Sequence, residues 1–371
     1  MLRFAERMIM VLTFSLAVLG VLVITYASKS QGQGPYHFCV MQSLFLVVSL
    51  VAATIFYFVD YHVYRRPEVM WGLLAVMVIS LLLVHVPGLG RGAKGAHRWI
   101  SLGPLSLQPI EFVKLFIVVV LSAYMDRLGG LVNRFVLGFL VPVGILVVPF
   151  ILILLQPDFG GSLVYCALAG VTLLLGGLSL RRCAVLMVVG VVVIATLLAL
   201  NQNRMRRLQD ESSGKNEQAI QSERCFRNGG VWGKGIVNGM QKEYYLPECH
   251  TDFIFAVIGE DLGLVATSGL WMVYLLIFLG GTTIALRAPD KQGMALAFGA
   301  TLLICAQAGA NMAVVTHLFP TKGLALPFLS YGGSCLLASF SSVGILLNVG
   351  RVTLNREEDP TQVVVKPISF V

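Results

Sequence analysis

The residues best suited to chemistry lie between Leu246 and Gly263, in the sequence LPECHTDFIFAVIGEDLG. Four ionisable side chains fall within twelve residues there, against the apolar run FIFAVI: His250, Asp252, Glu260 and Asp261. Ionisable groups at the edge of a membrane segment are costly and are therefore typical of functional sites. The alternative is that Thr251 or Asp252 simply caps a helix. Capping accounts for one of these groups and not for four, so the pattern favours a functional site.

Two further carboxylates and a lysine stand where apolar residues are expected. Glu111 and Lys114, in QPIEFVKL, are three residues apart and so share one face of a helix. Opposite charges at membrane depth usually pair, so we expect an ion pair that is either structural or in contact with a substrate. Asp158, in QPDFGG, fits an ordinary turn aspartate. Its predicted place at the same membrane face as Asp252 favours a functional role.

Basic residues near the same face could bind a phosphate. Arg98 precedes Trp99 in KGAHRWISLG, and Trp at a membrane interface is commonly a headgroup anchor. The cluster Arg204, Arg206 and Arg207 suits a pyrophosphate, with lipid headgroups as the alternative ligand. The candidate substrate-binding residues are Arg98, Glu111, Lys114, Asp158, Arg204, Arg207, His250, Lys322 and Ser330.

Two glycine-rich segments are predicted to be irregular. PTKGLALPFLSYGGS, residues 320–334, carries Lys322 and Ser330, and its prolines and glycines would break any helix. Such backbone is tolerated at membrane depth where it is buried in protein or lines a wet cavity. NGGVWGKGIVNG, residues 228–239, follows no predicted strand and is not a dinucleotide fingerprint. We expect it to be a loop with exposed backbone.

The composition excludes a soluble globular protein. The chain of 371 residues is 57% hydrophobic and 12% charged, with a mean hydropathy of +0.81. These values predict an all-α, polytopic membrane protein with a single membrane domain over residues 1–371. The net charge is +8, and the basic residues are spread over membrane-flanking loops. Binding to anionic lipid headgroups accounts for them, so they do not indicate a nucleic-acid-binding protein.

Apolar segments predict about ten transmembrane helices, the first being an uncleaved span rather than a signal peptide. They cover Met8–Ala27, Phe38–Phe58, Met70–Val86, Ile110–Tyr124, Phe135–Leu155, Ser162–Leu178, Cys183–Leu200, Leu262–Leu286, Met294–Leu318 and Ser334–Val349. Because Leu262–Leu286 is already long enough to span, Asp252–Asp261 is expected to form a short outer helix, followed by a break near Asp261-Leu262-Gly263.

The distribution of Lys and Arg predicts the orientation. In short loops, twelve of them lie on the side of the termini and five on the other side. The excess places both termini in the cytoplasm, with a short tail over residues 351–371. The long loop between the seventh and eighth spans, residues 201–253, is then outside and carries Asp252.

The sequence gives little evidence for a disulfide or for a metal site. Cys225 and Cys249 are the only cysteines of the long loop, and a disulfide between them is a hypothesis that we favour less than two free thiols. No metal-ligand spacing is present. A divalent cation, Mg²⁺ or Mn²⁺, is an alternative, since carboxylate and pyrophosphate oxygens are hard ligands.

Several motifs in order, GAHRWISLG with QPIEFVK, QPDFGGS, GKGIVNGMQKEYYLPECHTDFIFAVIGEDLG and PTKGLALPFLSYGGS, resemble the FtsW/RodA (SEDS) family over nearly the whole chain. The segments GKGIVNGMQKEYYLPE and PTKGL before LPFLSYGGS are more similar to the FtsW branch. The related sporulation branch stays an alternative. By motif, the essential aspartate of the family matches Asp252, and its buried polar cluster matches Glu111, Lys114 and Asp158.

The resemblance implies a peptidoglycan glycosyltransferase of the bacterial cytoplasmic membrane that polymerises lipid II at the outer face, in cell division. It also implies partners: lipid II and the lipid-linked glycan, membrane lipids, a class B penicillin-binding transpeptidase and other division proteins. Asp252 would act as the general base for a sugar hydroxyl. Two other classes stay open, a lipid II flippase and a non-catalytic scaffold for division proteins.

Overall fold

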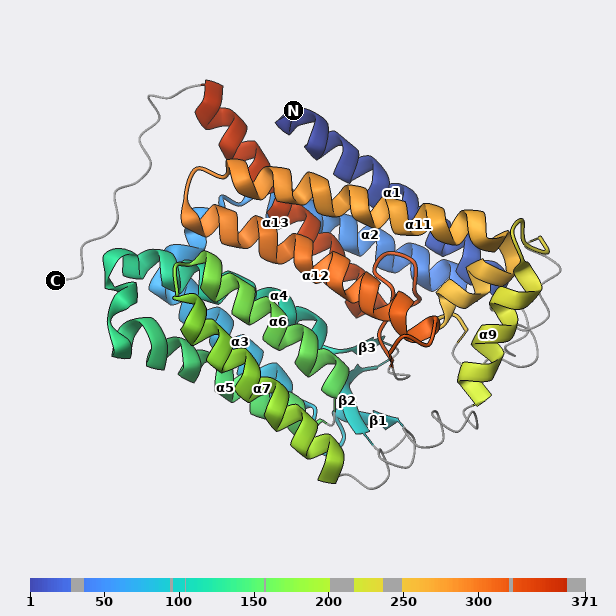
Figure 1. Ribbon diagram of the computed structural model, residues 1–371, viewed down its shortest axis with the longest axis horizontal. Helices are drawn as coiled ribbons and strands as arrows, with labels where there is room; N and C mark the ends of the chain where they lie inside the picture. The colour runs from blue at the N-terminus through green and yellow to red at the C-terminus, as the bar shows by residue number, and fades with distance from the viewer. Residues whose placement is uncertain are drawn as a thin grey trace.

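The computed structural model describes residues 1–27, 37–93, 96–103, 105–156, 158–200, 217–235, 249–319 and 323–358. The described chain is a helical bundle with one small sheet (Figure 1). The helices are α1 (Leu2–Ala27), α2 (His37–Phe58), α3 (Pro67–Leu83), α4 (Pro109–Leu128), α5 (Val141–Leu155), α6 (Phe159–Leu175), α7 (Leu180–Leu200), α9 (Glu217–Gly229), α11 (Ile254–Arg287), α12 (Lys291–Val315) and α13 (Gly333–Glu358). Short helical turns are η1 (Tyr61–Arg65), η2 (Gly129–Asn133) and η3 (Val136–Leu140).

The prediction of a polytopic all-α membrane protein is confirmed. Within the described ranges, eight helices are long and apolar enough to cross a membrane. Two more of the predicted spans, α3 and α6, form apolar helices of 17 residues each. Proline supports two of the helix starts, since Pro67 and Pro109 occupy the first turn, where no backbone N–H is needed.

Three helices, α4, α12 and α13, lie at the centre of the bundle. Buried residues make up 83% of the membrane segment of α13, 67% of that of α4 and 61% of that of α12, against 11% for α7. Figure 1 shows α7 at the lower edge, while α12 and α4 run through the middle. The polar groups of α4 and α12 therefore need partners inside the protein.

A three-stranded antiparallel sheet was not predicted. It comprises β1 (Gly90–Ala93), β2 (Ala96–Leu102) and β3 (Leu105–Leu107), in that order. Ile100 pairs with Leu107, and Gly103 turns the chain between β2 and β3 with a φ of +67°, a conformation that favours glycine. The strands are short, with four, seven and three residues, so the sequence indicated only a connection between the third and fourth predicted spans. The sheet positions Arg98 at the edge of the bundle.

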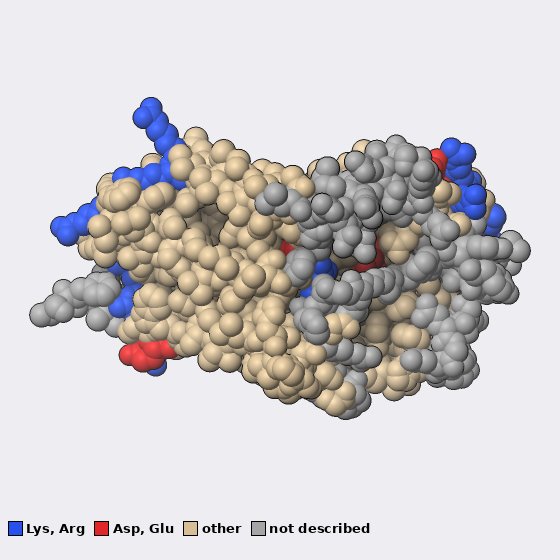
Figure 2. All heavy atoms as spheres, turned by 90° about the horizontal axis from the view of Figure 1, so that it is seen from below, with Lys and Arg blue, Asp and Glu red and all other residues tan. Residues whose placement is uncertain are grey.

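Loops gather at two ends of the bundle, because successive helices alternate in direction. At the upper left in Figure 1, an ion pair between Arg3 and Glu358 joins α1 to α13, so the two terminal helices meet. The placement of both termini in the cytoplasm stays a prediction. At the right end lie α9, the sheet and the start of α11. The view from below shows Lys and Arg at both ends, and acidic and basic atoms in a hollow beside the grey segments (Figure 2).

Candidate functional site

Asp252 lies in a tight turn, residues 249–253, that we call the aspartate turn. α11 begins directly after it, at Ile254, and the N-cap position belongs to Phe253, which makes no side-chain cap hydrogen bond. Neither Thr251 nor Asp252 therefore occupies the N-cap position. The interpretation of Asp252 as an ordinary helix cap loses its basis, and the half-buried carboxylate stands just outside the start of the helix.

The backbone of the aspartate turn is fixed from outside. Three successive carbonyl oxygens each accept a hydrogen bond: His250 O from Tyr331 N (2.8 Å), Thr251 O from the Ser330 hydroxyl (2.6 Å) and Asp252 O from Asn311 Nδ2 (2.8 Å). The donors belong to α12 and to residues 323–332, which we call the proline loop. Because all three carbonyls are held, the backbone position from which the Asp252 carboxylate projects is set by the fold.

The proline loop also lies against the carboxylate. A Cβ atom on Gly323 would be 2.7 Å from Oδ2 of Asp252, so a larger residue there would displace the carboxylate. Ser330 is 2% exposed. Its hydroxyl accepts a hydrogen bond from Leu326 N (2.7 Å) and donates to Thr251 O, so both roles serve the fold of the loop and the turn.

The ring of His250 packs among aromatic side chains. Its centroid lies 5.1 Å from that of Phe38 on α2 and 5.8 Å from that of Tyr331. Phe38 and Tyr331 contact each other edge to face at 5.1 Å. Together with the carbonyl of His250, which accepts from Tyr331, these contacts tie the aspartate turn to α2 and to the proline loop.

The predicted ion pair of α4 is confirmed. Lys114 Nζ lies 2.8 Å from Glu111 Oε1, and the two side chains are 1% and 9% exposed. Gln307 of α12, which the sequence did not single out, completes the cluster, since its Oε1 accepts from Lys114 Nζ at 2.6 Å. Its Nε2 donates to Ala325 O at 3.1 Å and approaches Glu111 Oε2 at 3.4 Å. Such a buried pair is satisfied only when further hydrogen bonds surround it, as here.

Asp158 and Arg98 lie at the same end of the bundle. Asp158 is the N-cap of α6, where its Oδ1 accepts from Gly161 N at 2.9 Å. That is the role expected of a turn aspartate. Arg98, half-buried on β2, donates from Nε to Gln156 O at 3.2 Å. Gln156 stands two residues before Asp158, so one short segment after α5 anchors the arginine and leads into the cap.

The predicted break in α11 is confirmed at Gly263. This residue has a φ of +77° and a ψ of −170° inside a helix that otherwise runs from Ile254 to Arg287. Four backbone hydrogen bonds from the segment 230–235 satisfy both sides of the break: Lys234 N to Glu260 O (3.0 Å), Gly235 N to Asp261 O (2.9 Å), Leu264 N to Gly230 O (3.0 Å) and Val265 N to Val231 O (3.3 Å). The described part of the glycine-rich loop therefore uses its backbone to cap two helix ends.

Only glycine fits at this junction. A Cβ atom on Gly263 would collide with Gly233 N and Val231 O, and one on Gly233 would collide with Asp261 O. Phe226 of α9 packs against the ring of Phe255 at 5.8 Å, and Ser222 donates to Val315 O at 2.7 Å. α9 thus holds the outer part of α11 against α12.

Three predicted basic residues, Arg204, Arg207 and Lys322, lie outside the described residues, as does Arg206. The cysteines are all free thiols, so the disulfide between Cys225 and Cys249 is absent. Both are fully buried at 0% exposure. In the part of the chain that the structure describes, no group of three His, Cys, Asp or Glu side chains is arranged to hold a metal ion.

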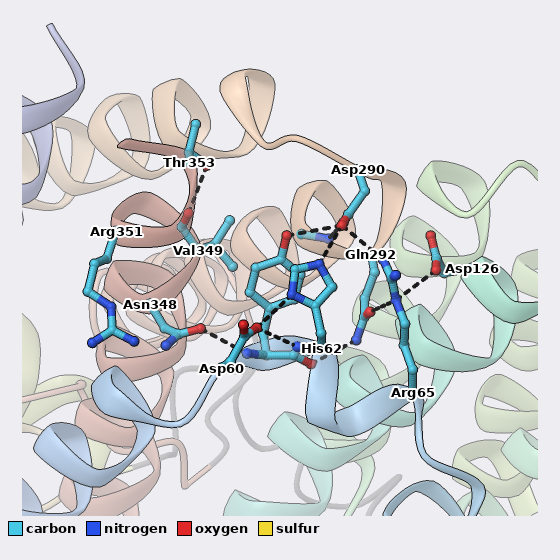
Figure 3. A network of polar contacts seen from close by, with 12 residues as sticks. Asp60, His62, Arg65, Asp126, Asp290, Gln292, Asn348, Val349, Arg351 and Thr353 are labelled. Carbon is cyan, nitrogen blue, oxygen red and sulfur yellow. Dashed lines mark hydrogen bonds and ion pairs between the residues drawn. The ribbon is translucent and has the colours of Figure 1, made fainter. Parts of the chain in front are cut away.

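The opposite end of the bundle holds a polar network that the sequence analysis missed (Figure 3). Asp290, the N-cap of α12, accepts hydrogen bonds from Tyr61 OH (3.1 Å), His62 Nε2 (2.9 Å), Arg65 Nη2 (2.8 Å) and Gly293 N (2.7 Å). Arg65 also pairs with Asp126 of α4 at 2.9 Å, and Tyr61 N donates to Asn348 Oδ1 of α13 at 3.0 Å. Nothing local in the sequence links residues 60–65 to residues 126, 290 and 348, so the spacing of these residues gives no sign of the network.

The pKa of His62 in this network is raised. Burial would lower the pKa of His62, but hydrogen bonds to Asp290 and Asp60 outweigh it and raise the pKa to about 9. Burial would likewise raise the pKa of Asp290, yet its hydrogen bond with His62 and its other donors hold that pKa below the usual value. The network is therefore charged at neutral pH.

Comparisons with known proteins agree with this architecture. The FtsW/RodA/SpoVE family, described as "Cell cycle protein", matches residues 6–355. "Probable peptidoglycan glycosyltransferase FtsW" of Trichlorobacter lovleyi is 37% identical over 93% of this chain and 92% of its own. "Stage V sporulation protein E" of Bacillus subtilis is 32% identical over 93% of this chain and 97% of its own.

Solved structures give the same result. A chain from a peptidoglycan synthase complex that coordinates polymerization and crosslinking superposes with a TM-score of 0.75 and 25% identity, covering 93% of this chain and 97% of that one. The rod shape determining protein RodA of Thermus thermophilus gives 0.68 and 26%, covering 92% of this chain and 95% of that one. The match over nearly the whole chain, in sequence and in fold, shows that this protein belongs to the FtsW/RodA/SpoVE family.

Proposed function

We propose that this protein is a peptidoglycan glycosyltransferase that polymerises lipid II into glycan strands in cell division. The observation that carries the proposal is the fixed turn at Asp252, held at all three of its successive carbonyls beside a buried ion pair of α4. A carboxylate on a fixed backbone turn, at the end of a bundle of this family, suits a reaction that depends on the placement of one proton acceptor.

In the proposed reaction, a hydroxyl oxygen of the lipid II sugar attacks the anomeric carbon of the lipid-linked glycan. The new C–O bond forms as the bond to the pyrophosphate oxygen breaks, and the pyrophosphate leaves with the electron pair. Asp252 takes the hydroxyl proton, because a neutral hydroxyl is a poor nucleophile. One displacement with a single carboxylate inverts the configuration, whereas retaining enzymes use two paired carboxylates.

Cations are assigned to the leaving pyrophosphate. Arg98 lies at the rim of the bundle and suits this role, and so by sequence do Arg204, Arg207 and Lys322. Lys114 is fully buried in bonds to Glu111 and Gln307. We therefore assign Lys114 a structural role, in which it joins α4 to α12 through Glu111 and Gln307, rather than contact with phosphate. A divalent cation is the alternative: the Asp252 carboxylate would help to hold it, and it would supply positive charge for the leaving pyrophosphate. Loss of polymerisation in a chelator, with recovery on adding Mg²⁺ or Mn²⁺, would favour it.

The proposed topology has about ten membrane crossings, both termini in the cytoplasm and the aspartate turn outside. A membrane-impermeant thiol reagent tests it. Cys225 is unsuitable because it is 0% exposed, whereas Trp232 in the loop after α9 is 81% exposed. Trp232→Cys in a chain without its native cysteines should react in intact cells. Reaction only after the membrane is opened would invert the orientation.

We further propose a crosslinking partner, a class B penicillin-binding transpeptidase. The supporting observation is the similarity to a chain from a peptidoglycan synthase complex. Purified protein should polymerise lipid II faster with its cognate partner than alone. An equal rate in the two samples would remove the partner from the catalytic unit.

The decisive experiment compares Asp252→Asn with Glu223→Gln. The first variant keeps size and hydrogen bonding but cannot accept the proton, so polymerisation of purified lipid II should be lost while the protein remains folded. The second removes an exposed carboxylate of α9 and should leave the rate unchanged. Near-normal turnover in Asp252→Asn would overturn the assignment of the base.

A flippase would need the end of the bundle opposite the aspartate turn to open. At that end, however, the network around Asp290 joins η1, α4 and α12 through charged hydrogen bonds, and η1 to α13 through a neutral one. This arrangement favours a site that is open at one end only. A scaffold without activity would leave the positioning of Asp252 without a purpose.

A further inference from the structure

Two amide side chains of α12 face the candidate site, and the proposed chemistry uses neither. Gln307 and Asn311 are four residues apart, so they stand one above the other on the same face of the helix. They are 2% and 1% exposed. An amide buried in a membrane-spanning helix is costly unless its hydrogen bonds are made.

Asn311 ties the aspartate turn to the proline loop. Its Nδ2 donates to Asp252 O at 2.8 Å and to Leu324 O at 2.6 Å, which commits both N–H bonds of the amide. Two carbonyl oxygens would repel the amide oxygen, so the nitrogen must face them. Leu324 follows Gly323, which lies against the Asp252 carboxylate. One side chain therefore fixes both the backbone that carries the carboxylate and the backbone that borders it.

Gln307 makes the equivalent connection one helical turn away. Its Oε1 accepts from Lys114 Nζ at 2.6 Å, and its Nε2 donates to Ala325 O at 3.1 Å. The two amides thus bind the successive carbonyls of Leu324 and Ala325. We call this pair the amide ladder, since its two rungs join the α4 ion pair and the aspartate turn to one short backbone segment.

The ladder has one group that the fold does not satisfy. Asn311 Oδ1 is buried, and it has no hydrogen-bond partner among the described residues. Buried acceptors without a partner are few in native proteins, and a functional role is one reason for their persistence.

We infer that Asn311 is a positioning residue for Asp252 and that Gln307 links the Glu111–Lys114 pair to the same proline-loop backbone. The inference rests on the proposed function, in which Asp252 is the base. In this inference, α12 fixes the position of the Asp252 backbone relative to the buried Glu111–Lys114 pair. The side chain of Asn311 acts through the backbone of Asp252 and not on the substrate.

Asn311→Ala tests this inference, with Gln292→Ala as the matched control. Gln292 is also a fully buried amide of α12, bonded to Arg65 Nε (2.6 Å) and Tyr61 O (3.1 Å), but it lies at the opposite end of the helix. The two variants should lower the melting temperature by similar amounts. Only Asn311→Ala should lower kcat, by about 100-fold for a shift of the base by about 1 Å, with little change in KM.

The pH profile distinguishes positioning from general stability. In Asn311→Ala the acid limb of kcat, which reports the base, should move relative to the wild-type protein, whereas in Gln292→Ala it should stay in place. If Asn311→Ala does not accumulate in folded form, Asn311→Ser, which keeps one donor, should give an intermediate loss and the same displacement. A kcat equal to that of the control, or a loss of kcat with an unmoved acid limb, overturns the inference.

The second rung is tested by combination. Gln307→Ala with Asn311→Ala should lower kcat by less than the product of the two single losses, because both act on one loop segment. A strictly multiplicative loss would show that Gln307 and Asn311 act separately, and it would overturn the inference that they act through one loop segment. Failure of the proposed function is recognised separately, by turnover in Asp252→Asn.

Discussion

Replacing Lys114 with Met should destabilise the protein by about 3–5 kcal/mol, because it leaves the Glu111 carboxylate buried without its partner. The charged atoms lie 2.8 Å apart, with side chains 1% and 9% exposed. At an effective dielectric constant of about 20, unit charges at that distance attract by about 6 kcal/mol. Desolvation opposes most of this gain in the intact pair, but the lone carboxylate would keep its desolvation cost and lose the attraction. Gln307 would also lose the donor to its Oε1.

A double-mutant cycle measures the coupling. Glu111→Gln alone should cost about as much as Lys114→Met, and the double variant should fall short of the sum by about 2–3 kcal/mol. The assay is reversible unfolding of the purified variants in one detergent, followed by circular dichroism. A surface pair on α9 serves as the control: Arg227 and Glu223 approach to 2.7 Å but are 78% and 53% exposed, so their coupling should be about 0.3–0.5 kcal/mol. A coupling in α4 no larger than that of the control would refute the reasoning.

Three further predictions concern Gly323, His62 and Gly263. Gly323→Ala places a methyl group 2.7 Å from the carboxylate of the aspartate turn, so polymerisation of lipid II should fall at least about 10-fold without loss of folding; an unchanged rate would contradict this geometry. The raised pKa of His62, about 9 against 6.5 for an unperturbed histidine, gives a stabilisation of at most about 3 kcal/mol that is complete below about pH 6.5 and lost as the pH rises through about 9. The melting temperature should therefore fall over that range, and His62→Gln should reduce the slope. Gly263→Ala should unfold the junction of α11, because its φ of +77° and the facing backbone exclude a side chain; Gly269→Ala, on the same helix with open space, should be neutral or stabilising.

Features encoded by local sequence were predicted well. Membrane helices are recognisable because apolar runs are long, and the ion pair of α4 because its members are three residues apart. The break at Gly263 follows from a span that was already complete without the preceding helix. In each case the signal lies within one stretch of chain.

Features that depend on distant contacts were not predicted. In the sequence, Asn311 and Gln307 are two polar residues of an otherwise apolar helix. Their role becomes visible only when the fold places the proline loop and the aspartate turn beside them. The partners of Asp290 come from residues 60–65, 126 and 348, and no local spacing joins these positions. Cys225 belongs to a long loop whose sequence does not reveal that α9 packs this side chain inward, at 0% exposure.

The capping of the α11 break by residues 230–235 bears on how the protein is made. The part of α11 after Gly263 is apolar and can enter the bilayer as a helix by itself. The part before it, which contains the buried carboxylates Glu260 and Asp261, completes its backbone hydrogen bonds only when the segment after α9 arrives. We expect biogenesis to have two stages, insertion of the spans and later closure of the junction. A newly inserted chain would then have its membrane anchor before its aspartate turn is in place, and it would be inactive until assembly is finished.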